Sequence, residues 1–415
     1  MTDAYLPKQG GIEVQVHDLA MRQLLAGHTV EVLTCAPDPG PASAAEAAGG
    51  PAPEQLTGAS PAGPTDGAGA SSGAGAPAGA ADGPLVHRVR IPWGRVRRTN
   101  AMIHERYRRE RPDVVHVHLS VLSPLGILAV RAASRCGVPV LVTLHSLWWF
   151  ATPLYRIADQ LLRWGRWRVH WGAVSELAAA PLRSILGRRG EVTVLPNGVE
   201  PGAWAVEAVP RDPGEVVVVS VMRLAARKRP RALLQVVRKA RARLPRGVRL
   251  RVIVVGDGPL RHRLEREIAR LDLQDVVELA GRMERDQIRE LYRRADAYIA
   301  PAILESFGIA ALEARCAGVP VIARSQTGIA DFIHDGEHGL LAPSDAGLAS
   351  ALVELATRPD LRARMARHNR DCAPDTGWDD VLQRCELAYK VAHELAGPQP
   401  AGRAATARRR VRASA

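Results

Sequence analysis

The feature that most constrains the fold of this chain is a regular alternation of short apolar runs with amphipathic helical stretches, in two successive series. Continuous runs rich in Val and Ile are typical of parallel strands that are buried on both faces, with the intervening helices as crossovers. Two such series predict an α/β protein with two doubly wound, Rossmann-like domains. The first series of predicted strands covers 29–35, 86–91, 113–117, 138–143 and 192–195, and the second covers 215–221, 250–255, 276–279, 297–300 and 319–323.

The 415 residues suffice for two domains of ordinary size. An N-terminal domain is expected over 1–205 and a C-terminal domain over 206–380, because 196–213 carries an Asn-Gly pair and several prolines. Residues 37–84 interrupt the first series, and Ala, Gly, Pro and Ser supply 39 of these 48 residues. Such a segment has too little apolar surface to bury, so a disordered insertion in a surface loop is predicted, with a linker as the alternative.

The start of the chain departs from the expected pattern. A first strand should precede the Gly10-Gly11 turn and the helical stretch 12–26, but only its last few residues are present. We therefore expect either a true start upstream or a domain that tolerates a shortened first strand. Gly11 allows backbone N–H groups to approach an anion closely, although a tight turn that needs a positive φ explains the glycines equally well.

Charge and cysteine content exclude several classes of protein. The formal net charge is +13, but only four of the 56 basic residues are lysines, which indicates that part of the arginine excess is compositional. No nucleic-acid recognition motif is present, so no nucleic acid is expected as a partner. The five cysteines include no C-x-x-C pair, so neither a disulfide framework nor a zinc ribbon is predicted. With no apolar run of transmembrane length and no signal peptide, a cytoplasmic protein is expected.

Two basic residues follow the predicted strand 215–221, at the edge where Rossmann-like sheets bind ligands. Arg223 and Lys228 lie in the loop before a helix that begins near Pro230. A strand-to-helix loop with these two side chains can neutralise a diphosphate, and a solvated basic loop is the alternative. Arg227 and Arg229 are interpreted as surface neighbours.

Histidines lie in or after two other predicted strands. His145 follows the strand 138–143 and is expected to face the cleft between the domains, where it can donate a hydrogen bond or exchange a proton. A packing or helix-capping role is the alternative. His116 and His118 share one face of a strand, but no third ligand lies near them in the sequence, so no metal site is predicted.

The stretch P-A-I-L-E-S-F-G-I-A-A-L-E-A-R-C contains two carboxylates, Glu305 and Glu313, in an apolar and helical setting. Eight helical residues rise about 12 Å, so the two acids cannot act on one atom as an acid–base pair. They can instead contact the two ends of one elongated ligand, while the N–H groups of 306–309 face negative charge at the start of the helix. A nucleotide sugar has this layout of sugar, diphosphate and ribose.

Together these segments resemble the retaining glycosyltransferases of family 4, also called glycosyl transferases group 1. The resemblance covers nearly all of the chain outside the insertion and the basic tail, in the family's order and spacing. Its elements are P-K-Q-G-G-I-E, P-D-V-V-H-V-H, T-L-H-S, A-V-S-E, V-L-P-N-G-V-E, M-R-L-A-A-R-K, V-G-D-G-P and the E-x7-E motif that ends at Glu313. The resemblance implies a GT-B fold, in which two Rossmann-like domains face each other across a cleft. A helix over 381–398 is then expected to pack back on the N-terminal domain, followed by a disordered basic tail over 399–415.

The resemblance also implies roles for individual residues. Arg223 and Lys228 occupy the positions that neutralise the diphosphate leaving group, and Gly11 occupies the position of a backbone amide near the donor phosphates. Glu305 matches the glutamate that binds hydroxyls of the donor sugar, and Glu313 matches the one that binds the ribose hydroxyls.

Further implied site residues line the donor sugar. Phe307, Gly308 and Ile309 match the backbone beside the sugar and phosphates, and His145 matches a residue next to the sugar. The predicted catalytic residues are then His145, Arg223, Lys228 and Glu305. Residues 325–331 depart from the family's usual G-G-x-P-E loop, so base or ribose contacts there are expected to differ.

The implied reaction moves a hexosyl group, with retention of configuration, from a nucleoside-diphosphate sugar to a hydroxyl of a lipid, glycan or small molecule. UDP- and GDP-sugars are the expected donors, as co-substrates, and neither a metal, another cofactor nor an enzymic nucleophile is expected. A nucleotide-sugar epimerase or hydrolase on the same fold is the alternative. An NAD-dependent oxidoreductase is disfavoured, because a clean G-x-G-x-x-G with a following ribose acid is missing.

Two segments rich in arginine and aromatic residues suit an anionic membrane surface, and with it a lipid-linked acceptor. Residues 84–111 carry nine arginines against two acids, and 155–171 carry four arginines and three tryptophans. An ordinary amphipathic helix whose tryptophans face the core is the preferred alternative. The tail from 403 to 412, with five arginines, can act as an electrostatic tether to the inner face of the plasma membrane.

Overall fold

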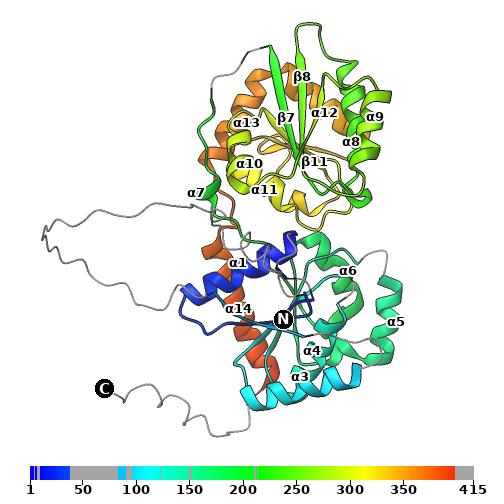
Figure 1. The fold of residues 1–415 in the computed structure, drawn as a ribbon. Coiled ribbons are helices and arrows are strands. Elements are labelled where there is room, and N and C mark those ends of the chain that lie inside the picture. Colours follow the sequence, from blue (N-terminus) through cyan, green and yellow to red (C-terminus); the bar gives the residue numbers. More distant parts are fainter. Residues whose placement is uncertain are drawn as a thin grey trace, which may run out of the picture.

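The computed structural model describes residues 1–3, 5–6, 10–37, 83–89, 96–121, 123–148, 152–209, 212 and 214–397. It contains two α/β units, drawn one above the other in Figure 1, each built on parallel strands with helices packed against them. The predicted α/β architecture with two Rossmann-like domains is thereby confirmed, whereas the domain limits at 205 and 380 stay predictions. The tail at 399–415 and nearly all of the insertion at 37–84 lie outside the described residues.

The C-terminal unit is organised around six parallel strands in the order β12-β11-β10-β7-β8-β9. Followed from the β9 edge, this is the order 3-2-1-4-5-6 of a doubly wound dinucleotide-binding sheet, with β7 as its first strand. The order reverses between β7 and β10, and ligands of such sheets bind at the carboxyl ends of the strands at this point. The strands are β7 Glu215–Val221, β8 Arg249–Val255, β9 Val277–Gly281, β10 Ala297–Ala300, β11 Val321–Arg324 and β12 Gly339–Ala342.

The N-terminal unit follows the same strand order, with its first strand reduced to a single bridge. Thr2 forms parallel bridges to Thr34 in β1 and to His118 in β3, and so joins the β1-β2 pair to the β3-β4-β5-β6 sheet. The shortened first strand expected from the sequence is therefore still placed between its two neighbours. The strands are β1 Glu31–Thr34, β2 Leu85–Arg88, β3 Val115–Leu119, β4 Val140–Leu144, β5 His170–Ala173 and β6 Val192–Val194.

Helices connect successive strands and cover the faces of both sheets (Figure 1). None of those in the described ranges is both long and apolar enough to cross a membrane. In the N-terminal unit they are α1 Gly11–Leu25, α3 Val96–Glu110, α4 Pro124–Cys136, α5 Thr152–Leu162 and α6 Glu176–Leu186. Those that follow are α7 Pro201–Trp204, α8 Pro230–Arg241, α9 Arg261–Arg270, α10 Arg285–Tyr292, α11 Ile309–Cys316, α12 Asp345–Thr357 and α13 Pro359–Asp371.

The last helix, α14, spans Trp378–Ala396 and packs against β4, β5 and α1 of the N-terminal unit (Figure 1). The predicted return of a C-terminal helix is confirmed, and the helix begins three residues before the expected 381. Gly198 makes the contact possible, because a Cβ there would lie 2.4 Å from the Trp378 ring. The two chain segments that connect the units run side by side, since Val199 in one forms a β-bridge with Gly377 in the other.

Two strands, β5 and β12, are absent from the sequence prediction. Their sequences, H-W-G-A and G-L-L-A, contain no β-branched residue, so they lack the composition that identifies a buried strand. Gly339 in β12 has a packing role that periodicity does not reveal, because a Cβ there would lie 1.9 Å from the Val321 carbonyl oxygen. Both segments therefore form strands because of tertiary packing and not because of their local composition.

Candidate active site

The switch point between β7 and β10 brings together two loops that carry the predicted site residues. Ala297 of β10 pairs in parallel with Val218 of β7, so the carboxyl ends of the two strands emerge next to each other. The loop after β7 holds Arg223 and Lys228, and the loop after β10 holds Glu305. The side chains proposed from separate parts of the sequence therefore share one edge of the sheet.

Lys228 and Glu305 form an ion pair across this edge, through the Lys228 Nζ and the Glu305 Oε2 atoms. Their side chains are 25% and 15% exposed, so the pair lies in a partly desolvated place that a ligand can still reach. The main chain of Glu305 is also held, because its carbonyl oxygen accepts a 2.9 Å hydrogen bond from the N–H of Gly328. A charge pair of this kind is ready to exchange partners with an incoming sugar and phosphate.

The Arg223 loop is held by the glycine-rich end of β8. The N–H of Leu224 donates to the carbonyl oxygen of Asp257 at 2.9 Å, and a Cβ on Gly256 would lie 2.0 Å from the carbonyl oxygen of Met222. Only glycine allows this approach, and Gly256 has a φ of 127°. The Arg223 side chain is exposed and forms no hydrogen bond or ion pair with another described residue, so its charge is available to an anion.

The start of α11 faces the start of α1 from the other unit. A Cβ on Gly11 would lie 3.3 Å from the Cδ1 atom of Ile309, the first residue of α11. Gly308, the N-cap residue, has a φ of 96°, and a Cβ there would lie 2.5 Å from Cγ1 of Ile329. Two helix N-termini with their unpaired N–H groups thus converge, which favours a bound anion between them. Phe307 is buried beside this point and packs against Phe332, with ring centroids 5.1 Å apart.

Glu313 lies one turn into α11, and burial raises the pKa of its carboxyl to about 8, against the smaller opposing effect of Arg285. No described residue donates a hydrogen bond to this carboxylate. Its negative charge is one of the causes that raise the pKa values of Tyr292 and Tyr298, after their burial. A partly buried acid whose oxygens receive no hydrogen bond from the described residues is suited to form hydrogen bonds with ligand hydroxyls.

His145 reaches the site from the N-terminal unit. Its carbonyl oxygen accepts a 2.7 Å hydrogen bond from the hydroxyl of Ser306, the residue after Glu305. The ring Nε2 atom lies 3.0 Å from Nδ1 of His118. Burial lowers the pKa of His145 to about 4, so the ring is neutral at pH 7. His145 therefore lies beside the loop that carries Glu305, and its predicted position next to a donor sugar stays a prediction.

A second histidine, His116, lies next to His118 and deeper in the N-terminal unit. The rings of His116 and His118 lie with centroids 4.1 Å apart and planes tilted by 31°, and burial lowers the pKa of both far below the usual value. The two ring nitrogens of His116 are engaged, at 2.9 Å from the hydroxyl of Tyr389 and 2.8 Å from that of Thr143. This arrangement is a satisfied hydrogen-bond network that links the site to α14, and it leaves His116 no free nitrogen for a metal.

Several residues at the site were not singled out from the sequence. Besides Ser306, Asp331 contacts the other unit, where its carboxylate accepts a 2.6 Å hydrogen bond from the N–H of Glu176 at the start of α6. The interpretation of Arg229 as a surface neighbour is wrong: it forms a bidentate ion pair with Asp345 at 2.9 and 2.7 Å. The partner lies 116 residues away, so no local pattern could have indicated it.

The roles of the predicted site residues stay predictions, and their positions are now known. Eight residues contribute to one region where the two units meet, with the ion pair and the α11 N-terminus at its centre. They are Gly11, His145, Arg223, Lys228, Glu305, Phe307, Gly308 and Ile309. Glu313 lies further along α11, near Arg285 of α10.

Comparison with known proteins gives matches along most of the chain. The family model "Glycosyltransferase Family 4" matches residues 9–202, and "Glycosyl transferases group 1" matches residues 206–371. The chain is 31% identical over 312 residues to a D-inositol 3-phosphate glycosyltransferase of Kribbella flavida, which covers 68% of this chain and 72% of that protein. It is 29% identical over 290 residues to the phosphatidylinositol N-acetylglucosaminyltransferase gpi3 subunit of Schizosaccharomyces pombe, and this match covers 68% of this chain and 61% of that protein.

Solved structures show the same architecture. HepE of Anabaena, crystallised in complex with UDP, superposes with a TM-score of 0.68 over 93% of this chain and 98% of that chain, at 17% sequence identity. The complex of HepE with UDP-glucose gives a TM-score of 0.66 over 95% of this chain and 98% of that chain. These structures support the GT-B fold. The chain therefore belongs to the group 1 glycosyl transferases of family 4 and is a glycosyltransferase with the two-domain GT-B fold.

Proposed function

We propose that this glycosyltransferase moves a hexosyl group from a UDP- or GDP-sugar to a hydroxyl acceptor, with retention of configuration and without a metal cofactor. The observation that carries the proposal is the Lys228–Glu305 ion pair beside the N-terminus of α11, with the unpaired Arg223 in the same loop as the lysine. A carboxylate for sugar hydroxyls and two cations for a diphosphate match the parts of one donor.

The comparisons support this donor class. HepE was crystallised with UDP and with UDP-glucose, and it shares the fold over nearly the whole chain. The two relatives described above are named as transferases of a sugar to phosphatidylinositol and to D-inositol 3-phosphate. An inositol hydroxyl is therefore the first acceptor to test, as the free phosphate and as the lipid.

The side chains explain how the reaction would be accelerated. Negative charge grows on the diphosphate as the anomeric bond breaks, and Lys228, Arg223 and the two facing helix N-termini can stabilise it. When Glu305 binds sugar hydroxyls, Lys228 becomes free to contact the phosphates. The main chain of His145 is bonded by the Ser306 hydroxyl, and its ring is bonded by His118. Because this ring is neutral, it can donate or accept a hydrogen bond but does not carry charge. The leaving phosphate accepts the acceptor's proton, and attack from the same face retains the configuration.

A thermal-shift panel of UDP-, GDP- and ADP-sugars tests the donor site. We expect one nucleotide series to raise the unfolding temperature, because a ligand that binds only the folded protein stabilises it. The same panel on Lys228→Ala should show a smaller shift. If neither nucleotide sugars nor nucleoside diphosphates raise the unfolding temperature, the donor-site proposal fails.

Product analysis tests the reaction type. With the stabilising donor and an inositol acceptor, we expect a new glycoside whose anomeric configuration, read by NMR coupling constants, equals that of the donor. Epimerised donor or free sugar formed without any acceptor would indicate an epimerase or a hydrolase instead. A rate that survives exhaustive chelation supports the metal-independent proposal, and a rate restored only by added divalent ions contradicts it.

We also propose that the protein is cytoplasmic and binds the inner membrane surface through α5. Leu154, Ile157 and Leu161 follow one face of this helix and are 66%, 55% and 79% exposed. Figure 1 places α5 at the outer edge of the N-terminal unit. Exposed Arg156 and Arg163 flank the apolar face, which suits anionic headgroups.

The tryptophans predicted as membrane anchors have a different position. Trp164 and Trp171 are buried in the core, and Trp167 packs against it, as in the alternative that the sequence analysis preferred. The tryptophan of the other arginine-rich segment, Trp93 in 84–111, lies outside the described residues. Membrane contact would therefore rest on the α5 leucines and isoleucine.

Vesicle sedimentation tests this attachment. Leu154→Asp/Leu161→Asp should reduce binding to phosphatidylglycerol vesicles. The control Leu387→Asp/Leu395→Asp changes two exposed leucines of α14, whose neighbours carry charge of both signs, and should bind like the wild type. Equal binding by both double variants would contradict the assignment to α5.

A further inference from the structure

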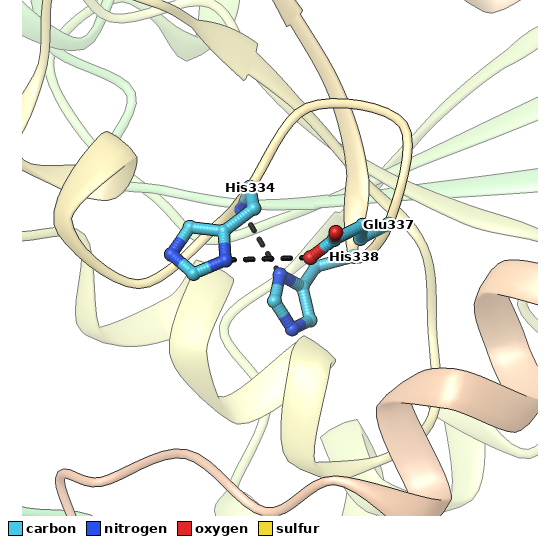
Figure 2. A group of neighbouring side chains, drawn as sticks. All are labelled: His334, Glu337 and His338. Carbon is cyan, nitrogen blue, oxygen red and sulfur yellow. Dashed lines mark hydrogen bonds and ion pairs between the residues drawn. The ribbon is translucent and has the colours of Figure 1, made fainter.

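The turn that leads into β12 gathers three side chains with metal-binding atoms: His334, Glu337 and His338 (Figure 2). One ligand atom from each residue lies within 4.8 Å of the other two. The turn is closed by the N–H of Gly336, which donates to the carbonyl oxygen of Gly339 at 2.8 Å. Gly336 has a φ of 82°, so the backbone takes a course that few other residues adopt. The convergence of the side chains is therefore built into the turn.

The spacing of the ligand atoms suits a small tetrahedral cation. His334 Nδ1 and Glu337 Oε2 lie 3.4 Å apart. Two ligands of a tetrahedral zinc ion, each bonded at about 2.0–2.1 Å, are separated by about 3.3 Å. An ion can therefore take the place between these two atoms with little movement of either side chain.

In the third ligand, His338, the Nδ1 atom accepts a hydrogen bond and is therefore unprotonated. The backbone N–H of His334 donates to this atom at 3.0 Å, so Nδ1 carries a lone pair. Figure 2 shows the Nδ1 atom turned toward the other two side chains.

We propose that His334, Glu337 and His338 form a binding site for a divalent transition-metal ion, with Zn²⁺ as the best match. Two imidazoles and one carboxylate are a common zinc ligand set, and solvent would complete the coordination. The Nδ1 atom of His338 would exchange its hydrogen bond from the main chain for the metal. His334 and Glu337 are exposed, so an ion has direct access.

The site is separate from the donor site and close to the segment that returns to the N-terminal unit. Asn369, in the last turns of α13, donates from Nδ2 to the carbonyl oxygens of Val319 and His338 at 3.2 and 3.1 Å. The ring of His368 lies with its centroid 4.8 Å from that of His338. A bound ion would therefore fix the shape of the β12 turn, which α13 contacts through Asn369 and His368, and this role lies beyond the sugar transfer proposed above.

The chain provides a matched control in another pair of the same geometry. His262 Nδ1 and Glu265 Oε2 lie 3.2 Å apart with the same i,i+3 spacing, and no third ligand joins them in the described part of the chain. If a histidine–glutamate pair alone bound the metal, both places would do so. The proposal requires the third ligand.

The test uses full-length protein without a histidine tag, stripped with a chelator and titrated with ZnCl₂ by calorimetry. We expect one ion per chain, and Co²⁺ in its place should give the visible absorption of a tetrahedral site. His334→Gln and Glu337→Gln should each weaken Zn²⁺ binding by about tenfold or more. A loss of about tenfold is typical even when the changed residue only contacts a metal ligand. His262→Gln should bind like the wild type.

Three outcomes would overturn the proposal. They are no binding of Zn²⁺ to the wild type, unchanged affinity in both His334→Gln and Glu337→Gln, and loss of binding only in Cys372→Ser. The last variant tests the neighbouring pair in which Cys372 Sγ lies 3.8 Å from His368 Nδ1. Thermal melting of the metal-free variants shows whether any loss of binding comes from unfolding, which the exposure of His334 and Glu337 makes unexpected.

Discussion

The two units contribute opposite electrostatic properties to the place where they meet. The C-terminal side presents charged groups, the Lys228–Glu305 pair and the unpaired Arg223. The N-terminal side presents His145 and His118, whose pKa values are lowered by burial so that both rings are neutral. The difference indicates that the charged diphosphate end of a donor belongs to the C-terminal unit, whereas the neutral rings suit an uncharged hydroxyl.

This contrast has a structural cause, since both units follow the same strand order. In the N-terminal unit, α14 packs on β4 and β5, and the Tyr389 hydroxyl closes the histidine network from behind. No helix from the other unit covers β7 and β10 in this way within the described ranges, so charged side chains there keep contact with solvent. Burial under the returning helix α14 therefore favours neutral side chains at the end of the N-terminal sheet, although the two sheets have the same strand order.

Removal of the cation from the charged side should have the largest effect. We expect Lys228→Ala to lower kcat by about 10²–10³-fold, the loss typical of one group that stabilises transition-state charge, with a smaller change in KM. Steady-state rates of nucleoside diphosphate release measure this. Arg227→Ala removes an exposed charge next to it and should keep the wild-type rate. Equal rates for Lys228→Ala and Arg227→Ala would contradict the role of the lysine.

Loss of the second carboxylate should act on donor binding. Glu313→Ala removes a hydrogen-bonding partner of the ligand hydroxyls and leaves them unsatisfied, which costs about 1–3 kcal/mol, so donor affinity should fall by about 5- to 150-fold. Calorimetric titration with the nucleoside diphosphate measures the change. An unchanged Kd would show that the ribose binds elsewhere.

The pH dependence of stability provides an independent measure of Glu313. Its pKa is raised to about 8 in the folded chain from an ordinary value of 4.5. Between these values the unfolded chain loses the proton first, so stability falls as the pH rises and levels off above about 8. Glu313→Gln removes the titration, so it should exceed the wild type by about 4 kcal/mol in unfolding free energy at pH 8 and by almost nothing at pH 4.5. Denaturant melts test this, with the exposed Glu394→Gln as a control that shows no such trend.

On the neutral side, His118 is expected to act by positioning His145. His118→Ala should lower kcat by about threefold to tenfold, the equivalent of one hydrogen bond, whereas His118→Asn keeps a polar atom near the Nδ1 position and should restore most of the rate. A purely structural role would leave both variants equally impaired. Because the pKa of His145 is about 4, this ring should cause no loss of rate between pH 8 and pH 6.

The exposed contact between the units should matter least. Arg285 of α10 and Asp18 of α1 form an ion pair at 3.2 Å, with side chains 58% and 24% exposed. Such pairs contribute up to about 1 kcal/mol, so Asp18→Asn should change kcat/KM by no more than about fivefold, and less at high salt. A larger loss would show that this contact, and not the buried histidines, couples the units.

Much of the fold was predictable because its signals are local. The Val-rich run of β7 and the apolar run of β10 were assigned from composition alone, with the bounds that the structure has. The strand β5 was missed because His170 and Trp171 do not have the composition of a buried strand, although all four of its residues are buried. The strand-end rule placed Lys228 at the ligand-binding edge of the sheet, but neither this rule nor the spacing of the two acids indicated that Lys228 pairs directly with Glu305.

The sequence by itself determined two doubly wound α/β domains, the loops at the strand ends, and the acids and bases that these loops carry. Each of these follows from residues within one strand and the turn after it, where periodicity and composition act over short distances. Only the tertiary structure decided which groups are charged or neutral and which units touch, as with Ser306 and His145, 161 residues apart. Burial and long-range contact depend on how complete layers pack, and no local pattern in the chain encodes that.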